Sequence, residues 1–190
     1  MLKIIKIEIL IIGILLLIIL IPNNLHIDFY NYFPYFKNFL QQIYIIKFFE
    51  KITILGDSLW YFQISIFFIV VFFFLKKFKI LKKYKSGIES IQYYNLLLFS
   101  SILSSGILTQ TIKHVVGRPR PSVLNFENEF NLKFFTLDSS FHSFPSGHAS
   151  TIFAVALVFS LIAPKLKIFF YILAIIIAFS RIVVGAHFIT

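Results

Sequence analysis

Long apolar runs dominate the pattern of hydrophobic and polar positions along this chain. Residues 9–21 are almost all isoleucine or leucine, and with Ile4 and Ile5 this stretch reaches the length of about 20 residues that spans a bilayer. Four further apolar runs follow, over residues 59–75, 93–112, 147–163 and 168–184. The pattern predicts an all-α, multi-span transmembrane helical bundle with five spans.

The first run has an alternative interpretation as a signal peptide, because Lys3 and Lys6 precede it. Pro22-Asn23-Asn24 follows the run, and it lacks the small residues of a cleavage site. We therefore favour an uncleaved first helix. Segment 28–52 is aromatic-rich with scattered charges, which predicts short interfacial helices in the first outer loop or, equally, helices packed against the bundle.

Composition and charge narrow the class of protein. Hydrophobic residues make up 58% of the chain and charged residues 14%, which excludes an ordinary soluble domain. There is no cysteine, so disulfides and thiolate chemistry are excluded. The net charge of +10 reflects lysines gathered on one side of the five alternating spans: Lys3, Lys6, Lys76, Lys77, Lys79, Lys82, Lys83, Lys85, Lys165 and Lys167. This bias marks the cytoplasmic side and does not predict a nucleic-acid partner.

Three segments on the opposite side carry candidate chemistry. The first contains Lys113 at the end of a span and Arg120 between Pro119 and Pro121, where Gly117 is a candidate helix cap. An arginine whose backbone is stiffened by two prolines is suited to bind a phosphate. Basic residues at helix ends also commonly extend to the membrane interface without binding a ligand.

The second segment, Pro145-Ser146-Gly147-His148, opens the fourth apolar run. A helix N-terminus offers free backbone N–H groups and a favourable dipole to an anion. By itself the segment also fits a simple N-cap. The third segment holds Arg181 and His187, which are six residues apart, so that about two helical turns bring them toward one face. An arginine in an apolar helix is costly and indicates a functional site.

Together these segments resemble the type 2 phosphatidic acid phosphatase superfamily. The motifs of that family are K-x6-R-P, P-S-G-H and S-R-x5-H-x3-D. The first matches Lys113 through Arg120-Pro121, the second matches Pro145 to His148, and the third matches Ser180-Arg181 as far as His187. Vanadium haloperoxidases share these motifs but are soluble, and the apolar spans argue against them.

The resemblance implies a role for each matched residue. His187 is the implied nucleophile and His148 the acid that protonates the leaving group. The implied phosphate-binding residues are Lys113, Arg120, Ser146, Gly147 and Arg181. The resemblance implies no metal and no cofactor. A carboxylate four positions after His187 is missing because the sequence ends at Thr190.

We therefore expect residues 1–190 to form a single integral membrane phosphatase domain that lacks the end of the third motif and a sixth helix. The expected activity is hydrolysis of a lipid phosphomonoester or diphosphate through a phosphohistidine, at the periplasmic face of a bacterial inner membrane. Candidate substrates are lipid A 1-phosphate, undecaprenyl diphosphate, phosphatidylglycerol phosphate and phosphatidic acid. The alternative is an inactive, truncated phosphatase-like membrane protein that only binds phospholipid.

Overall fold

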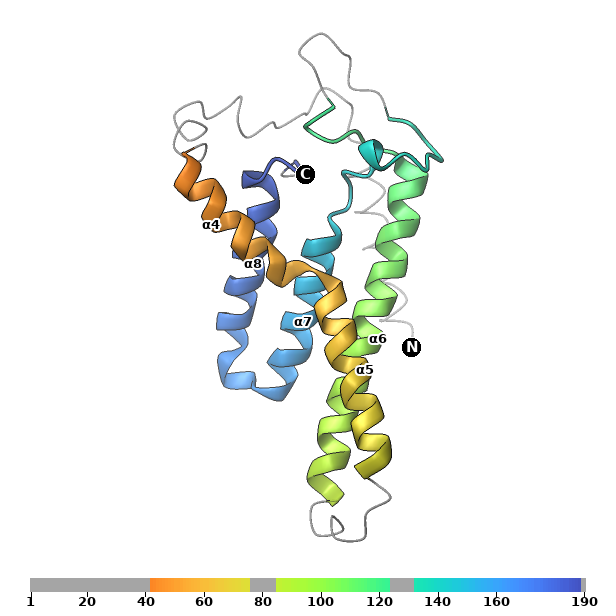
Figure 1. Ribbon diagram of the computed structural model, residues 1–190, viewed down its shortest axis with the longest axis vertical. Helices are drawn as coiled ribbons and strands as arrows, with labels where there is room; N and C mark the ends of the chain where they lie inside the picture. The colour runs from red at the N-terminus through yellow and green to blue at the C-terminus, as the bar shows by residue number, and fades with distance from the viewer. Residues whose placement is uncertain (1–41, 76–84, 124–131, 189–190) are drawn as a thin grey trace, which may run out of the picture.

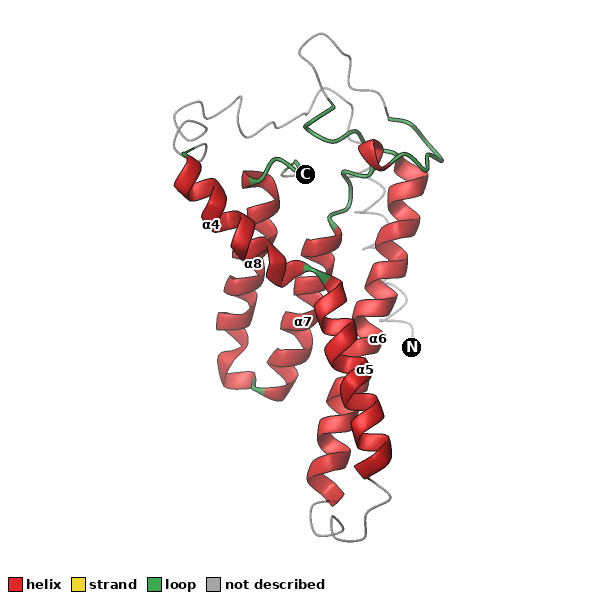
Figure 2. Ribbon diagram, in the orientation of Figure 1, coloured by secondary structure: helices red, strands yellow, loops and turns green. Residues whose placement is uncertain are grey.

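Helices and loops make up the part of the chain that the computed structural model describes, which is residues 42–75, 85–123 and 132–188 (Figure 1). The elements in chain order are α4 (Ile43–Thr53), η1 (Ile54–Gly56), α5 (Ser58–Leu75), α6 (Lys85–Val116), η3 (Ser139–Phe141), α7 (Gly147–Ile162), η4 (Pro164–Leu166) and α8 (Lys167–Val183). Figure 2 shows no strand in these ranges. The all-α prediction is confirmed for them.

Three helical stretches among the described residues are long and apolar enough to cross a membrane. They are Ile43–Leu75, Lys85–Val116 and Pro164–Val183. Helix α7 is apolar but has only 16 residues, or about 24 Å at 1.5 Å per residue. The predicted span at residues 9–21 lies outside the described residues. Three of the five predicted spans are therefore supported by helix length, and the other two remain predictions.

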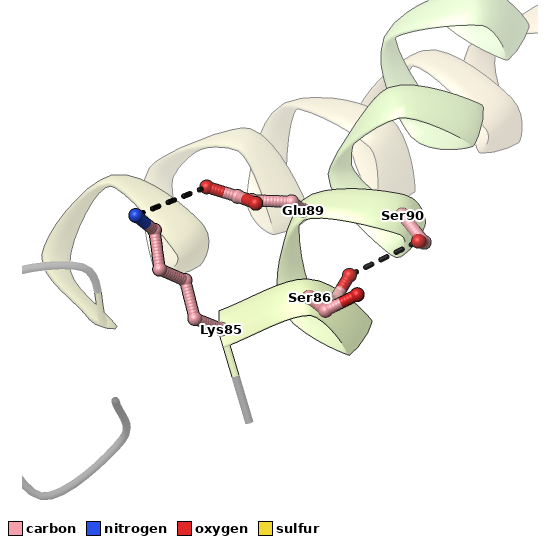
Figure 3. A network of polar contacts seen from close by, with 4 residues as sticks. All are labelled: Lys85, Ser86, Glu89 and Ser90. Atoms are coloured by element: carbon pink, nitrogen blue, oxygen red, sulfur yellow. Dashed lines mark hydrogen bonds and ion pairs between the residues drawn. The ribbon is translucent and has the colours of Figure 1, made fainter. Parts of the chain in front are cut away.

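Helix α6 is longer than the apolar run that predicted it. The run covers residues 93–112, whereas the helix has 32 residues and begins at Lys85. Its first turn is polar and exposed, with an i,i+4 pair in which Lys85 Nζ lies 3.9 Å from a Glu89 oxygen (Figure 3). Ser90 donates a hydrogen bond to the Ser86 carbonyl one turn away (Figure 3). Polar residues such as lysine and glutamate also form helices readily. The hydropathy pattern therefore located the apolar part of α6 and missed its two ends.

The helices bury small hydroxyl side chains and expose large apolar ones. On α5, Ser65 is fully buried while Phe67 is 62% exposed. The Ser65 backbone carbonyl accepts a hydrogen bond of 3.0 Å from the Asn95 side chain of α6. Buried hydroxyl residues recur on the other helices: Thr109, Thr151, Ser160 and Ser180. This arrangement is typical of helices that pack against one another within lipid.

Helix α7 lies at the centre of the described bundle, because it packs against both α6 and α8 (Figure 1). Helix α5 packs against α6, and α4 packs against α8. The segment 43–53, for which the sequence left two interpretations, thus contacts the bundle. The core cluster draws on α6, α7 and α8: Ile102, Ile152, Val155, Ala156, Ala174 and Ile177. This packing brings the C-terminal ends of α6 and α8 and the N-terminal end of α7 to one end of the bundle.

Candidate active site

A glycine ends α6 and fixes the direction of the chain beyond Lys113. Gly117 has φ +56°, and its N–H donates to the Lys113 carbonyl at 2.9 Å. A Cβ on Gly117 would lie 1.7 Å from the Lys133 carbonyl oxygen, so only glycine fits. The predicted helix cap is confirmed. It leaves Lys113 in the last turn of α6, where only 8% of the residue is exposed.

Backbone pairing holds Arg120 against the segment that leads into α7. The Arg120 N–H donates to the Ser140 carbonyl at 2.8 Å, and Arg120 Nε donates to the Ser139 carbonyl at 3.0 Å. The Ser143 N–H donates to the Arg118 carbonyl at 3.0 Å. These bonds tie the first candidate segment to the loop that precedes the second. Arg120 is therefore held to one short turn by two bonds, one from its backbone N–H and one from its guanidinium.

The second segment forms the N-terminal end of α7 as predicted. Ser146 is the N-cap, and its hydroxyl accepts a hydrogen bond of 3.4 Å from the Ala149 N–H. Lys113 lies directly beside this helix end, because its Nζ is 3.5 Å from the point where a Cβ on Gly147 would stand. The lysine ammonium group and the free N–H groups of the helix N-terminus thus act on the same space, and both attract an anion.

A tight turn, and not the helix, carries His187 to the same end of the bundle. Helix α8 ends at Val183, and Gly185 adopts φ +72°. The Gly185 N–H donates to the Ile182 carbonyl, and both Ala186 and His187 donate to the Arg181 carbonyl. The prediction that two helical turns join Arg181 to His187 was wrong. The glycine reverses the chain and brings the two residues together.

His187 is buried, and the orientation of its ring is defined. The residue is 6% exposed, and its Nδ1 lies 2.5 Å from the Ser143 carbonyl oxygen. A carbonyl only accepts, so Nδ1 carries the hydrogen and Nε2 carries the lone pair. Burial is the main cause that lowers the pKa of His187 to about 4, and the bond to Ser143 opposes it. The positive charges of Arg181, Arg120 and Lys113 lower the pKa further. The imidazole is therefore neutral at pH 7.

Arg181 is held from the side by α4. One of its terminal nitrogens, Nη1, donates a hydrogen bond of 2.9 Å to the Thr53 hydroxyl. Its Nε is buried and has no hydrogen-bond partner among the described residues. Arg181, Ser146 and His187 line a cavity of about 370 Å³, whose remaining wall is mostly apolar and includes Phe153, Ile175, Ala178, Phe179 and Ile182.

All seven residues that the sequence singled out lie at this end of the bundle. Arg120 and Arg181 both act electrostatically on Lys113, and the Lys113 and Arg181 charges act on His148. Like charges repel, so a bound anion would stabilise this arrangement. Among the described residues, no three His, Asp or Glu side chains lie close enough to hold a metal ion. That the site needs no metal stays a prediction.

The sequence did not indicate several contacts of the site. The Ser143 carbonyl and the Thr53 hydroxyl lie outside the motifs. Gly56 packs against His148, since a Cβ on it would lie 2.9 Å from the His148 Cβ. The negative charge of the neighbouring Asp57 also acts on His148. His142 instead lies against the His114 ring, with the centroids 4.5 Å apart and the planes tilted by 50°, and its Nε2 lies 3.1 Å from the Thr136 carbonyl oxygen.

Comparison with known proteins identifies the family. A family model described as the PAP2 superfamily matches residues 94–190, which include every one of the seven site residues. The chain belongs to the PAP2 superfamily. The predicted resemblance is thereby confirmed. Helix α6 from Tyr94 onward, α7 and α8 carry the match, whereas α4 and α5 precede it.

Two curated relatives of this PAP2 chain carry the same name. A lipid A 1-phosphatase of Rhizobium etli is 34% identical over 139 residues, which cover 73% of this chain and 60% of the relative. A lipid A 1-phosphatase of Rhizobium johnstonii is 33% identical over 139 residues, covering 73% of this chain and 57% of that relative. The chain thus matches less than two thirds of the length of either relative. No solved structure matches the chain.

Proposed function

We propose that this PAP2 chain is a membrane lipid phosphatase that works through a phosphohistidine on His187. One observation carries the proposal. Three cations, Lys113, Arg120 and Arg181, approach a buried neutral histidine at the edge of a mostly apolar cavity. Cations and helix N–H groups suit a phosphoryl group, and the apolar wall suits the hydrocarbon of a lipid.

In the first step, His187 Nε2 attacks phosphorus and the bond between phosphorus and the lipid oxygen breaks. His148 gives its proton to the departing oxygen, so the lipid leaves as an alcohol. For a diphosphate substrate the leaving group is the lipid monophosphate. A bound phosphoryl group favours the protonated form of His148, because its negative charge lies beside the ring. Lys113, Arg120, Arg181 and the N-terminus of α7 neutralise the charge of the transferring group.

In the second step, water attacks phosphorus of the phosphohistidine. His148, now neutral, takes a proton from that water, and the bond between phosphorus and Nε2 breaks. Inorganic phosphate leaves, His187 is neutral again and His148 is protonated for the next turnover. The bond to the Ser143 carbonyl keeps the His187 ring in one orientation through both steps.

Lipid A 1-phosphate is the substrate that we favour among the four candidates. The support is the name of the two relatives at 34% and 33% identity. The other candidates present the same chemistry, a phosphoryl group on a lipid oxygen. Only a direct comparison of rates separates the four.

We also propose that the site lies on the periplasmic side of a bacterial inner membrane. The lysine-rich connection 76–84 joins the end of α5 to the start of α6, and Lys165 and Lys167 lie between α7 and α8. The end of α5, the start of α6 and the turn between α7 and α8 all lie at the end of the helices opposite the site. Lysine-rich connections stay in the cytoplasm by the positive-inside rule, which supports a periplasmic site.

The test is release of inorganic phosphate by the purified chain in phospholipid nanodiscs. We expect release from lipid A exceeding that from undecaprenyl diphosphate, phosphatidylglycerol phosphate and phosphatidic acid. We expect His187→Ala to abolish release and also the phosphohistidine, which is labile in acid and is therefore trapped under alkaline denaturing conditions. His114→Gln is the matched control, because that histidine contacts His142 and does not line the cavity, and we expect it to keep activity.

Two results would overturn the proposal. One is a wild-type chain that binds these lipids and releases no phosphate from any of them. The other is release that persists in His187→Ala at the wild-type rate, which would exclude His187 as the nucleophile.

A further inference from the structure

The segment from α4 to η1 contacts the site from outside the three motifs. Phe49, Thr53 and Gly56 follow one another at spacings of four and three residues, which places them on one face of this helical segment. Each of the three contacts an element that carries a site residue. The segment also precedes residue 94, where the match to the family begins.

The three contacts run along the site from α8 to α7. Phe49 packs edge-to-face on Phe179 of α8, with ring centroids 6.0 Å apart. Thr53 accepts the bond of 2.9 Å from Arg181 Nη1. Gly56 lies so close to His148 that a Cβ would meet its Cβ at 2.9 Å. One face of the segment therefore touches both the arginine of the third motif and the histidine of the second.

We propose that Thr53 is a positioning residue that orients the guanidinium of Arg181 for the substrate phosphoryl group, an inference that rests on the proposed function. A guanidinium presents two pairs of donors, one formed by Nη1 and Nη2 and one by Nη2 and Nε. With Nη1 held by Thr53, the plane of the group is fixed and the pair of Nη2 and Nε is left for two phosphoryl oxygens.

The surroundings of Arg181 make this single bond important. Its Nε is buried without a hydrogen-bond partner among the described residues. A buried donor without a partner is costly, and a phosphoryl oxygen would relieve that cost. Within residues 42–75, 85–123 and 132–188 no carboxylate pairs with Arg181, so the hydroxyl of Thr53 defines the rotation of the guanidinium before substrate arrives.

The test measures binding of orthovanadate, a phosphate mimic, to the whole chain by calorimetry in detergent, so it does not depend on turnover. Thr53→Val keeps the shape of the side chain and removes the acceptor. We expect it to weaken vanadate binding about tenfold, as loss of a hydrogen bond to a charged group does. Thr53→Ser keeps the hydroxyl and should restore binding to within about twofold. Thr111→Val, an exposed threonine on α6, is the matched control and should bind as the wild type does.

A double-mutant cycle separates positioning from a general effect on the fold. In an Arg181→Lys background, we expect Thr53→Val to cause no further loss of binding. Steady-state kinetics should show a raised KM for the lipid with a smaller change in kcat. Vanadate binding that is unchanged in Thr53→Val, or that weakens equally in both backgrounds, overturns the inference.

The outcomes also distinguish this inference from the proposed function. A wild-type chain that binds vanadate in a Thr53-dependent way but releases no phosphate supports the positioning role and contradicts the phosphatase activity. Phosphate release that is insensitive to Thr53→Val supports the activity and contradicts the positioning role. A wild-type chain without saturable vanadate binding contradicts both.

Discussion

His187 and Ser143 are joined by a hydrogen bond of 2.5 Å from the imidazole Nδ1 to the backbone carbonyl oxygen. The two residues are 44 positions apart, so the bond connects the turn after α8 to the loop before α7. Because both residues are buried, water does not compete for either partner. The bond decides which nitrogen of His187 is free to react.

The lowered pKa of His187 gives the first prediction. With a pKa of about 4, well below the ordinary value for histidine, the ring stays neutral from pH 8 down to about pH 5. The nucleophile should therefore lose activity only as the pH falls through about 4, where the ring takes a proton. Histidine side-chain NMR of the labelled protein checks this, with assignment by His187→Gln. Arg181→Gln should raise the midpoint, and a wild-type midpoint at the ordinary value would contradict the prediction.

The helix cap at Gly117 gives a prediction about stability. Gly117→Ala places a Cβ against the Lys133 carbonyl in a left-handed conformation, and we expect a loss of about 2 kcal/mol or more. Gly106→Ala is the matched control on the same helix. Nothing lies within 4 Å of its new Cβ, so stability should be unchanged or slightly higher. Unfolding in a series of denaturing detergent mixtures measures both variants. Equal effects of the two substitutions would exclude the proposed cap.

The apolar wall of the cavity gives a prediction about substrate length. Ala178→Phe adds a ring to that wall, and we expect kcat/KM for a long-chain phosphorylated lipid to fall about tenfold or more. Turnover of a soluble aryl phosphate should change little, because it lacks the hydrocarbon that the wall contacts. Leu161→Phe, on an exposed position outside the cavity, serves as the control. An equal fall in kcat/KM for the lipid and the aryl phosphate would contradict this prediction, because it would place the effect at the phosphoryl site.

The absence of cysteine permits a direct test of the orientation. Ser122→Cys introduces a thiol on the exposed turn at the site end, and Lys165→Cys introduces one at the opposite end. In intact spheroplasts we expect a membrane-impermeant maleimide to label only the first variant. After the membrane is permeabilised, both should react. Labelling of Lys165→Cys alone in intact spheroplasts would reverse the proposed topology.

Much of the fold followed from the pattern of apolar residues. The run 147–163 predicted α7 to within one residue, and 168–184 did the same for α8, because each run coincides with a helix that ends at a cap or turn. Helix α6 was predicted too short, since its polar first turns are helical without being apolar. A hydropathy pattern identifies apolar stretches, and it does not detect polar turns at the ends of a helix.

The residue types of the site were also predicted, because Ser146 and Gly117 are typical of helix ends and the cations of the motifs lie near those ends in the sequence. Its supporting contacts were not. Ser143 acts through a carbonyl that every residue has, and Thr53 is 128 positions from Arg181. Neither contact has a spacing or a composition that a sequence pattern registers. Such partners emerge only once the helices are packed.

The apolar outer surface of the bundle has a thermodynamic consequence. Because the core between the helices is apolar and side chains such as Phe67 already face outward, separating the helices within a bilayer largely exchanges one apolar contact for another. Little apolar surface then reaches water, and the heat capacity hardly changes on unfolding. The stability of this bundle should therefore decline almost linearly with temperature, without the maximum and the cold denaturation that water-soluble domains show.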